Sequence, residues 1–214
     1  MRNLRAAAVL LALGLVAVLA PPARGAERVV VALGDSLTAG LGVAAEEAWP
    51  ALVEARLRRE GYPYRVVNAG VSGDTTAGGL RRVDWVLRNR PQVAVVALGA
   101  NDGLRGLDTD TMERNLLAIV ERLRGSGARV LVAGMRVPAN YGDAYTQAFR
   151  DVFPDVARRT GSALMPFLLD GVVADPRLNL ADGIHPNAAG HRVITERLWS
   201  YLLPLLRKDA GRNS

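Results

Sequence analysis

The chain has 214 residues, half of them hydrophobic, and a formal net charge of +6. This length and composition suffice for one folded domain with a sizeable core and argue against a disordered chain. The sequence contains no cysteine, which excludes disulfides, thiolate metal sites and cysteine nucleophiles. The arginines are scattered among acidic and apolar residues without aromatic partners, so we expect no nucleic-acid partner.

The first 25 residues have the pattern of a secretion signal. "MRNLR" carries two arginines, an uncharged apolar run follows over residues 6–20, and "PPARG" comes next. We therefore expect a signal peptide over 1–25, cleaved after Gly25, and a mature domain over 26–214 in the periplasm or outside the cell. The run is short for a spanning helix, so we expect no stable membrane span after processing; retention as an anchor is the alternative. Processing would lower the net charge from +6 to +3, because it removes three arginines and no acidic residue.

Five apolar runs predict the strands of a sheet. The runs are continuous rather than alternating, which is typical of strands that helices cover on both faces. We expect strands over residues 28–33, 64–70, 93–99, 128–134 and 163–167.

Longer amphipathic stretches between and after these runs predict helices over residues 46–60, 77–90, 110–124, 142–160 and 187–203. In the third of these, Asp110 and Glu113 make a capping-box pattern. Its apolar face would consist of Met112, Leu116, Ile119, Val120 and Leu123. Pro154 should interrupt the fourth helix, because proline lacks the amide proton that a helix interior needs. Asn187 is the expected cap of the last one.

The alternation of strands and helices predicts an α/β domain with a parallel sheet of about five strands and helices on both faces. No linker divides residues 26–214, and no repeat is visible. Ligands of such sheets bind beyond the carboxyl ends of the strands. The residues that directly follow the strands should therefore share one edge of the sheet, however distant they are in sequence.

A serine, a histidine and an aspartate suited to acyl transfer follow this rule. Ser36 comes after the first strand, and a serine hydroxyl needs a base, usually histidine, to take its proton. Asp182 lies three residues before His185, a spacing that lets the carboxylate fold back to the imidazole Nδ1 and fix its tautomer. Pro186 keeps His185 out of the helix that follows. His191, the other histidine, falls inside that helix and is interpreted as a packing residue.

Donors for an oxyanion also follow the strands. The backbone N–H groups of Ser36 and Gly70 and the amide of Asn101 could stabilise a tetrahedral intermediate. Histidine and aspartate are too sparse for a zinc or dinuclear site, so we expect no metal and no other cofactor. Each signal has a simpler explanation: Gly-Asp-Ser-Leu occurs in ordinary turns, Asn101 and Asp102 could form an Asx turn, and Asp182 could be a cap.

Taken together, these residues resemble the motifs of the GDSL, or SGNH, hydrolases. Four blocks occur in order: "GDSLTAG" with Ser36, "NAGVSGDT" with Gly70, "LGAND" with Asn101, and "DGIHP" with Asp182 and His185. The resemblance covers nearly all of residues 26–214 and implies a flavodoxin-like three-layer α/β/α sandwich. It also implies a serine nucleophile, a histidine base and an orienting aspartate at these positions, with Ser36, Gly70 and Asn101 as the oxyanion hole.

Four further segments are similar to one branch of this family, the bacterial periplasmic thioesterase/protease/lysophospholipases, or arylesterases. These segments are "AWPALVEARL", "VSGDTTAGGLRRV", "LGANDGLRGL" and "RVPANYGDAYTQAF". The resemblance implies a serine esterase for acyl esters, acyl-CoA thioesters and lysophospholipids. An acyl chain needs an apolar groove beside the nucleophile. We expect that groove to be lined by Leu37, Leu104, Leu107, Tyr141 and Ile184.

The sequence leaves two other functions open. A carbohydrate acetylesterase of the same superfamily would place the same triad beside a more polar groove. A non-catalytic flavodoxin-like protein could bind a phosphate or flavin on the backbone amides of "GDSLTAG". That second reading leaves Asp182, His185 and Asn101 without a role.

Overall fold

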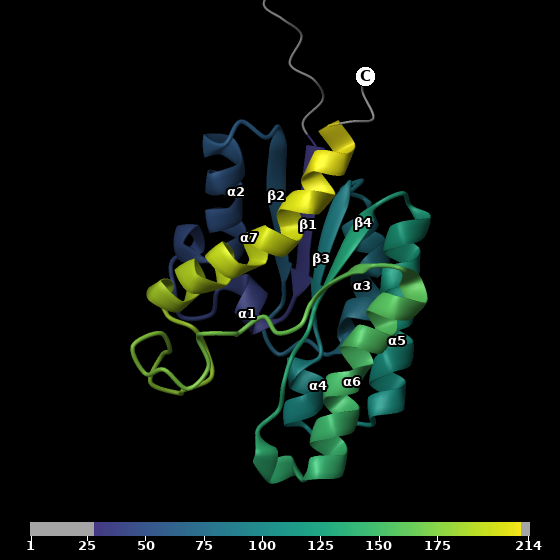
Figure 1. Cartoon of the computed structure of the whole chain (residues 1–214), viewed down its shortest axis with the longest axis vertical. Coiled ribbons are helices and arrows are strands. Elements are labelled where there is room, and N and C mark those ends of the chain that lie inside the picture. Colours follow the sequence, from purple (N-terminus) through teal and green to yellow (C-terminus); the bar gives the residue numbers. More distant parts are fainter. Residues whose placement is uncertain (1–27, 211–214) are drawn as a thin grey trace, which may run out of the picture.

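A parallel sheet of five strands lies between two layers of helices (Figure 1). This computed structural model describes residues 28–210, so the expected signal peptide over 1–25 lies outside the described residues. The strand order is β2-β1-β3-β4-β5. The strands are β1 (Arg28–Gly34), β2 (Tyr64–Gly70), β3 (Val93–Ala97), β4 (Arg129–Ala133) and β5 (Ala163–Met165). The predicted three-layer α/β/α architecture is confirmed.

Seven α-helices and two short 3-10 helices occur within residues 28–210. The α-helices are α1 (Ser36–Ala39), α2 (Trp49–Arg59), α3 (Thr76–Leu87), α4 (Ala100–Leu104), α5 (Thr109–Gly125), α6 (Asp143–Thr160) and α7 (Ala188–Ala210). The 3-10 helices are η1 (Ala45–Glu47) and η2 (Ala139–Tyr141). Helices α3, α5 and α6 pack together on one face of the sheet, and α2 and α7 pack together on the other (Figure 1).

The core lies between the sheet and these two helix layers. Residues 93–98, in and just after the central strand β3, are almost fully buried because helices cover the sheet on both sides. The apolar face predicted for α5 is buried at all five positions: Met112, Leu116, Ile119, Val120 and Leu123. Burial of one such side chain contributes about 1.5–3 kcal/mol. The long-range packing of α5 therefore follows from its sequence pattern.

The start of α5 differs from the expected capping box. Asp108 is the cap, and its carboxylate accepts hydrogen bonds from the Thr111 N–H at 2.8 Å and the Thr111 hydroxyl at 2.6 Å. The expected Asp110–Glu113 box is therefore wrong. The helix begins at Thr109, so Asp110 lies inside its first turn, and Asp108 accepts the hydrogen bond from the unpaired N–H of Thr111. Glu113 instead forms an ion pair with Arg159 of α6 at 2.6 Å.

Helix α6 is not interrupted at Pro154, contrary to the prediction. The helix continues on both sides of the proline, and the flanking Phe153 and Val156 are buried in the core. Their burial offsets the backbone hydrogen bond that proline removes.

The last helix begins as predicted and ends later. The Asn187 side-chain oxygen accepts hydrogen bonds from the N–H groups of Ala189 and Gly190 at 2.9 and 3.1 Å, as expected for a cap. The helix then continues through Pro204 to Ala210, beyond the predicted end at 203. Across residues 28–210, we find no helix with the length and apolar character needed to cross a membrane.

Candidate active site

Ser36 lies at the carboxyl end of β1, where the chain leaves the sheet and starts α1. Asp35 makes this sharp exit possible, because its carboxylate caps the new helix by accepting a hydrogen bond from the Leu37 N–H at 3.0 Å. Ser36 is largely buried, with 8% of its surface exposed. The nucleophile candidate therefore sits on a fixed element and not in a free loop.

The segment between β5 and α7 brings His185 and Asp182 to this serine. Ser36 Oγ lies 3.0 Å from His185 Nε2, and His185 Nδ1 lies 2.6 Å from Asp182 Oδ2. The other carboxylate oxygen of Asp182 accepts the backbone N–H groups of His185 and Ile184, both at 2.9 Å. The three residues thus form one chain of hydrogen bonds, as the sequence predicted.

The pKa of Asp182 decides how the protons are arranged in this chain. The backbone N–H of His185, then that of Ile184, and then the imidazole lower this pKa to about 2. The carboxylate is therefore ionised at neutral pH and keeps a proton on His185 Nδ1. Nε2 then carries a lone pair and can accept the proton of the Ser36 hydroxyl.

Two asparagines that the sequence analysis did not single out for this task shape the histidine-bearing segment. Asn179 donates to the carbonyl oxygens of Val172 and Asp175 at 2.7 and 2.8 Å. Asn187, besides capping α7, donates to the Arg177 carbonyl at 2.9 Å. Side-chain bonds to backbone carbonyls replace regular secondary structure here, so they fix a long connection that would otherwise have few restraints.

Asn101, in α4 just beyond β3, lines the same cavity as Ser36. Its side-chain Nδ2 donates to Asp35 Oδ2 at 3.3 Å and to the Asp74 carbonyl at 3.0 Å. The Ser36 N–H, at the start of α1, has no hydrogen-bond partner among the described residues. Two of the three expected oxyanion donors therefore lie at the ends of the neighbouring strands β1 and β3.

Gly70, the third expected donor, has a different task in this structure. Its N–H already donates to Asn68 Oδ1 at 3.0 Å. A Cβ added at Gly70 would lie 2.2 Å from the backbone nitrogen of Ala39, so only glycine lets α1 pack this closely on β2. The close approach of α1, not access to the serine, explains the glycine.

Gly73, for which the sequence predicted no role, has the free backbone N–H that an oxyanion donor needs and that Gly70 lacks. It adopts a left-handed conformation with φ of +80°, and its N–H has no hydrogen-bond partner within residues 28–210. The carbonyl of the next residue, Asp74, accepts a hydrogen bond from the Asn101 side chain, so this turn lies beside the expected donor Asn101. The signal was present in the sequence as the Ser-Gly-Asp turn three residues after Gly70.

The family assignment follows from a match over most of the chain. The model of the GDSL-like lipase/acylhydrolase family matches residues 32–193, a span that contains Ser36, Asn101, Asp182 and His185. The chain belongs to the GDSL-like lipase/acylhydrolase family.

Individual members of the GDSL-like family are similar over almost their whole length. Esterase TesA of Pseudomonas aeruginosa is 43% identical over 184 residues, which cover 86% of this chain and 92% of the relative. Thioesterase 1/protease 1/lysophospholipase L1 of Escherichia coli K12 is 37% identical over 179 residues, 83% of this chain and 85% of the relative. A crystal structure of TesA superposes with a TM-score of 0.81 at 43% identity, covering 83% of this chain and 99% of that chain. This GDSL-like protein is an enzyme that hydrolyses ester bonds.

The candidate catalytic cavity, which Ser36 and His185 line, has a volume of about 220 Å³ and is mostly apolar. Three of the expected groove residues line it: Leu37, Leu104 and Ile184. The other two, Leu107 and Tyr141, are outside the lining; the Tyr141 hydroxyl instead donates to the Leu104 carbonyl at 2.9 Å. Apolar lining residues that the sequence analysis missed are Met135, Phe167, Leu169 and Val173.

Burial strongly raises the pKa of Asp35, which directly precedes Ser36. Desolvation raises the pKa of this fully buried carboxyl to about 6, although the Leu37 N–H, the charge on His185 and the Asn101 amide oppose the rise. A buried carboxylate beside a nucleophile is typical of a functional position. Asp35 is part of the "GDSLTAG" motif, and the sequence predicted no role for it.

Arg82 of α3 holds the ends of the two strands beside the serine. Its guanidinium donates to the carbonyls of Gly34 and Ala69 at 2.8 and 2.7 Å and pairs with Asp74 at 2.7 Å. One planar group thus satisfies three acceptors from separate segments. Nothing in the local sequence distinguishes Arg82 from Arg81 beside it, and only the fold separates them.

His191 lies apart from this machinery, as expected. It is buried in α7, and its Nδ1 accepts the N–H of Trp49, at the start of α2, at 3.3 Å. Burial lowers its pKa to about 4, so the imidazole is neutral and serves packing. Within residues 28–210, we find no cluster of three or more metal-ligating side chains.

Proposed function

We propose that this enzyme hydrolyses carboxylic esters and thioesters of acyl chains through an acyl-enzyme on Ser36. The observation that carries the proposal is the continuous chain from Ser36 Oγ through His185 to Asp182, with 3.0 and 2.6 Å between the bonded atoms. This is the arrangement that lets histidine act as a general base for a serine nucleophile.

The reaction runs in two halves. His185 Nε2 takes the proton of Ser36 as its oxygen attacks the substrate carbonyl, and Asp182 stabilises the resulting imidazolium. The imidazolium then protonates the departing alcohol or thiol, which leaves an acyl ester on Ser36. Water deprotonated by the same imidazole attacks this ester, releases the carboxylic acid and restores the serine proton.

The negative oxygen of each tetrahedral intermediate needs preorganised donors. We assign this role to the Ser36 N–H, the Asn101 side chain and the Gly73 N–H. Gly73 replaces the Gly70 of our sequence-based expectation, because the Gly70 N–H is bonded to Asn68 and the Gly73 N–H is not bonded to any described residue.

The acyl portion of the substrate would occupy the apolar cavity. Leu37, Leu104 and Ile184 from three separate segments line it together with Met135 and Phe167. Such a surface favours medium or long acyl chains, and the names of the relatives, esterase and thioesterase/lysophospholipase, support the same class. A carbohydrate acetylesterase would need more polar partners near the serine than this lining provides.

The experiment that tests this function combines substrates and variants. We expect turnover of p-nitrophenyl esters, acyl-CoAs and lysophospholipids to favour acyl groups of eight or more carbons over acetyl. Ser36→Ala and His185→Ala should lose at least about 10³-fold in turnover while remaining folded. His191→Gln is the matched control and should retain most activity. Preference for acetyl esters would support the carbohydrate esterase instead.

We also propose that residues 1–25 direct secretion to the periplasm or beyond it. The two arginines, the apolar run and the small residues before position 26 support this proposal. N-terminal sequencing of the exported protein should find a start near Ala26, and a start at Met1 would contradict it.

A further inference from the structure

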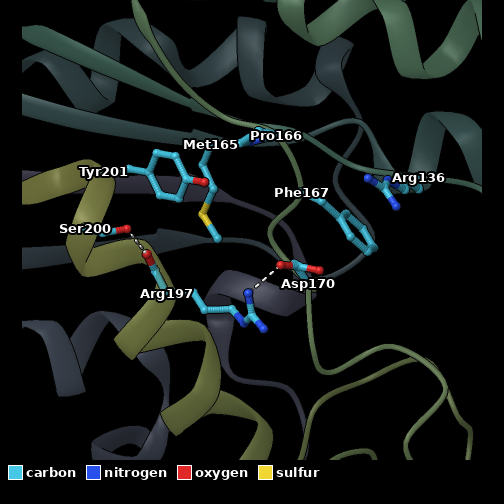
Figure 2. Close-up of a pocket in the computed structure, with 8 residues that line it drawn as sticks. All are labelled: Arg136, Met165, Pro166, Phe167, Asp170, Arg197, Ser200 and Tyr201. Atoms are coloured by element: carbon cyan, nitrogen blue, oxygen red, sulfur yellow. Dashed lines mark hydrogen bonds and ion pairs between the residues drawn. The ribbon is translucent and has the colours of Figure 1, made fainter.

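A second, polar hollow lies beside the catalytic cavity (Figure 2). Its volume is about 240 Å³. The segments that follow β4 and β5 contribute Arg136, Phe167 and Asp170, and α7 contributes Arg197 and Tyr201. None of these residues belongs to the triad or to the oxyanion donors.

The hollow and the catalytic cavity share part of their walls. Arg136 and Phe167 line both. The Arg136 guanidinium carbon lies 4.7 Å from the centre of the Phe167 ring, so the two side chains stack. In the view of Figure 2, the Phe167 ring lies between Arg136 and the Arg197–Asp170 pair. A ligand that leaves the catalytic cavity past this stack would enter the hollow.

The charges of the hollow favour an anion. Arg197 forms an ion pair with Asp170 (Figure 2), and its guanidinium packs against the backbone of Gly171, where an added Cβ would lie 2.7 Å from Arg197 Nη2. Arg136 is exposed and has no acidic partner among the described residues. Two guanidinium groups and one carboxylate therefore leave the hollow with one net positive charge.

We propose that this hollow binds a phosphate group on the alcohol or thiol portion of the substrate while the acyl chain occupies the apolar cavity. The inference rests on the proposed function. Guanidinium groups match the geometry of phosphate oxygens and bind them with charge-assisted hydrogen bonds. The phosphate could belong to the headgroup of a lysophospholipid or to the coenzyme A of a thioester.

The test compares substrates that share an octanoyl group. Octanoyl lysophosphatidylglycerol and octanoyl-CoA carry phosphate, whereas p-nitrophenyl octanoate does not. For each variant we take the ratio of kcat/KM on a phosphate-bearing substrate to kcat/KM on the p-nitrophenyl ester. We expect Arg136→Gln and Arg197→Gln to lower this ratio about tenfold each. Arg136→Lys keeps the positive charge, so its ratio should be close to the wild-type ratio.

Asp170→Asn should change the kcat/KM ratio in the opposite direction to the two arginine variants. It removes the carboxylate that competes with phosphate for Arg197, so the ratio should rise several-fold. The matched control is Arg88→Gln, an exposed arginine at the far end of α3, which should leave the ratio at the wild-type value. A fall of the ratio for one of the two phosphate-bearing substrates alone would support the subsite and identify its source.

Equal effects of Arg136→Gln and Arg197→Gln on all three substrates would overturn the proposal, as would a lower ratio in Asp170→Asn. A binding measurement separates this failure from failure of the proposed function. Calorimetry with octanoyl-CoA and the Ser36→Ala protein requires no turnover. Addition of Arg197→Gln should weaken this binding about tenfold, and unchanged affinity would contradict the subsite whether or not the enzyme is an esterase.

Discussion

The buried carboxylate of Asp35 accepts a hydrogen bond from the side chain of Asn101, with 3.3 Å between Oδ2 and Nδ2. The residue before the nucleophile therefore holds the side chain that we assign to the oxyanion. The bond joins the ends of β1 and β3, which are neighbours in the sheet. Ser36 and the proposed oxyanion donor Asn101 are thus held by the ends of two neighbouring strands.

Removal of the Asn101 amide should reduce turnover with little change in substrate binding. We expect Asn101→Ala to lower kcat by about 10²–10³, because a preorganised donor acts mainly on the transition state. Steady-state kinetics with p-nitrophenyl octanoate measures this. Asn89→Ala, at the remote end of α3, is the control; a similar loss in both variants would refute the role of Asn101.

Asp35→Asn should make the protein more stable and less active. The pKa of Asp35 is about 6 in the folded protein, above its ordinary value, so the folded state holds the proton more tightly than the unfolded state. Stability is then lost as the pH rises from about 4 to about 6, and the full cost at pH 7 is on the order of 3 kcal/mol. Asparagine can still cap α1 through its side-chain oxygen and avoids this cost, but its NH2 group then faces the Asn101 donor, so the bond to Asn101 is lost.

Urea unfolding at two pH values checks the stability of Asp35→Asn. The variant should exceed the wild type by about 1–3 kcal/mol at pH 7 and by nearly nothing at pH 4. Its kcat should fall about tenfold, because the carboxylate no longer favours the imidazolium of His185. A variant that is equally active, or less stable at pH 7, would be evidence against this account.

His191 should make folding depend on pH in the opposite sense. Its pKa is about 4 in the folded protein, below the ordinary value, so the unfolded state binds the proton more tightly. The contribution of the neutral His191 to the free energy of unfolding is fully present above about pH 6.5 and decreases as the pH drops toward 4. At pH 5 the protein should have lost about 2 kcal/mol.

The variant His191→Gln isolates this effect, because Asp35 acts on the same pH range in both proteins. The measurement is the unfolding free energy of both proteins at pH 7 and at pH 5. The loss of stability between pH 7 and pH 5 should be about 2 kcal/mol smaller in the variant than in the wild type. Parallel pH dependences would show that His191 is not the group responsible.

Arg82 should matter for both stability and turnover although it does not touch the substrate. Arg82→Met removes the cation that pairs with Asp74 and the donor that Arg82 gives to the Gly34 and Ala69 carbonyls. We expect a loss of about 3 kcal/mol together with a lower kcat. Arg82→Lys should recover little, since one ammonium group cannot replace the planar fork. Wild-type kcat and stability in the lysine variant would contradict the positioning role.

Much of the fold could be predicted because it depends on patterns that the sequence carries locally. The continuous apolar runs identified the strands, and the periodic face of α5 was buried at every expected position. Errors occurred where two local signals competed. Asp108 and Asp110 are both suitable caps for α5, and only the structure shows that Asp108 accepts the N–H of the first turn. Pro154 should break a helix, but the buried packing of its neighbours keeps α6 continuous.

In the candidate site, too, the features that depend on local sequence could be predicted, and those that depend on tertiary contacts could not. Ser36 could be placed because it follows β1 directly, and Asp182 could be paired with His185 because only three residues separate them. The choice between Gly70 and Gly73 could not be made, because it depends on where α1 packs and on which N–H the Asn68 side chain occupies. Likewise, the bonds of Arg82 to Gly34 and Ala69 exist only once β1 and β2 are side by side.

The most direct test of the central claim is covalent labelling of the nucleophile. A p-nitrophenyl alkylphosphonate should release one equivalent of p-nitrophenol and add one phosphonyl group to the protein, which peptide mass spectrometry should locate on Ser36. Ser36→Ala should remain unlabelled, and His185→Ala should react far more slowly. A phosphonyl group on any other residue, or full labelling of Ser36→Ala, would contradict the account.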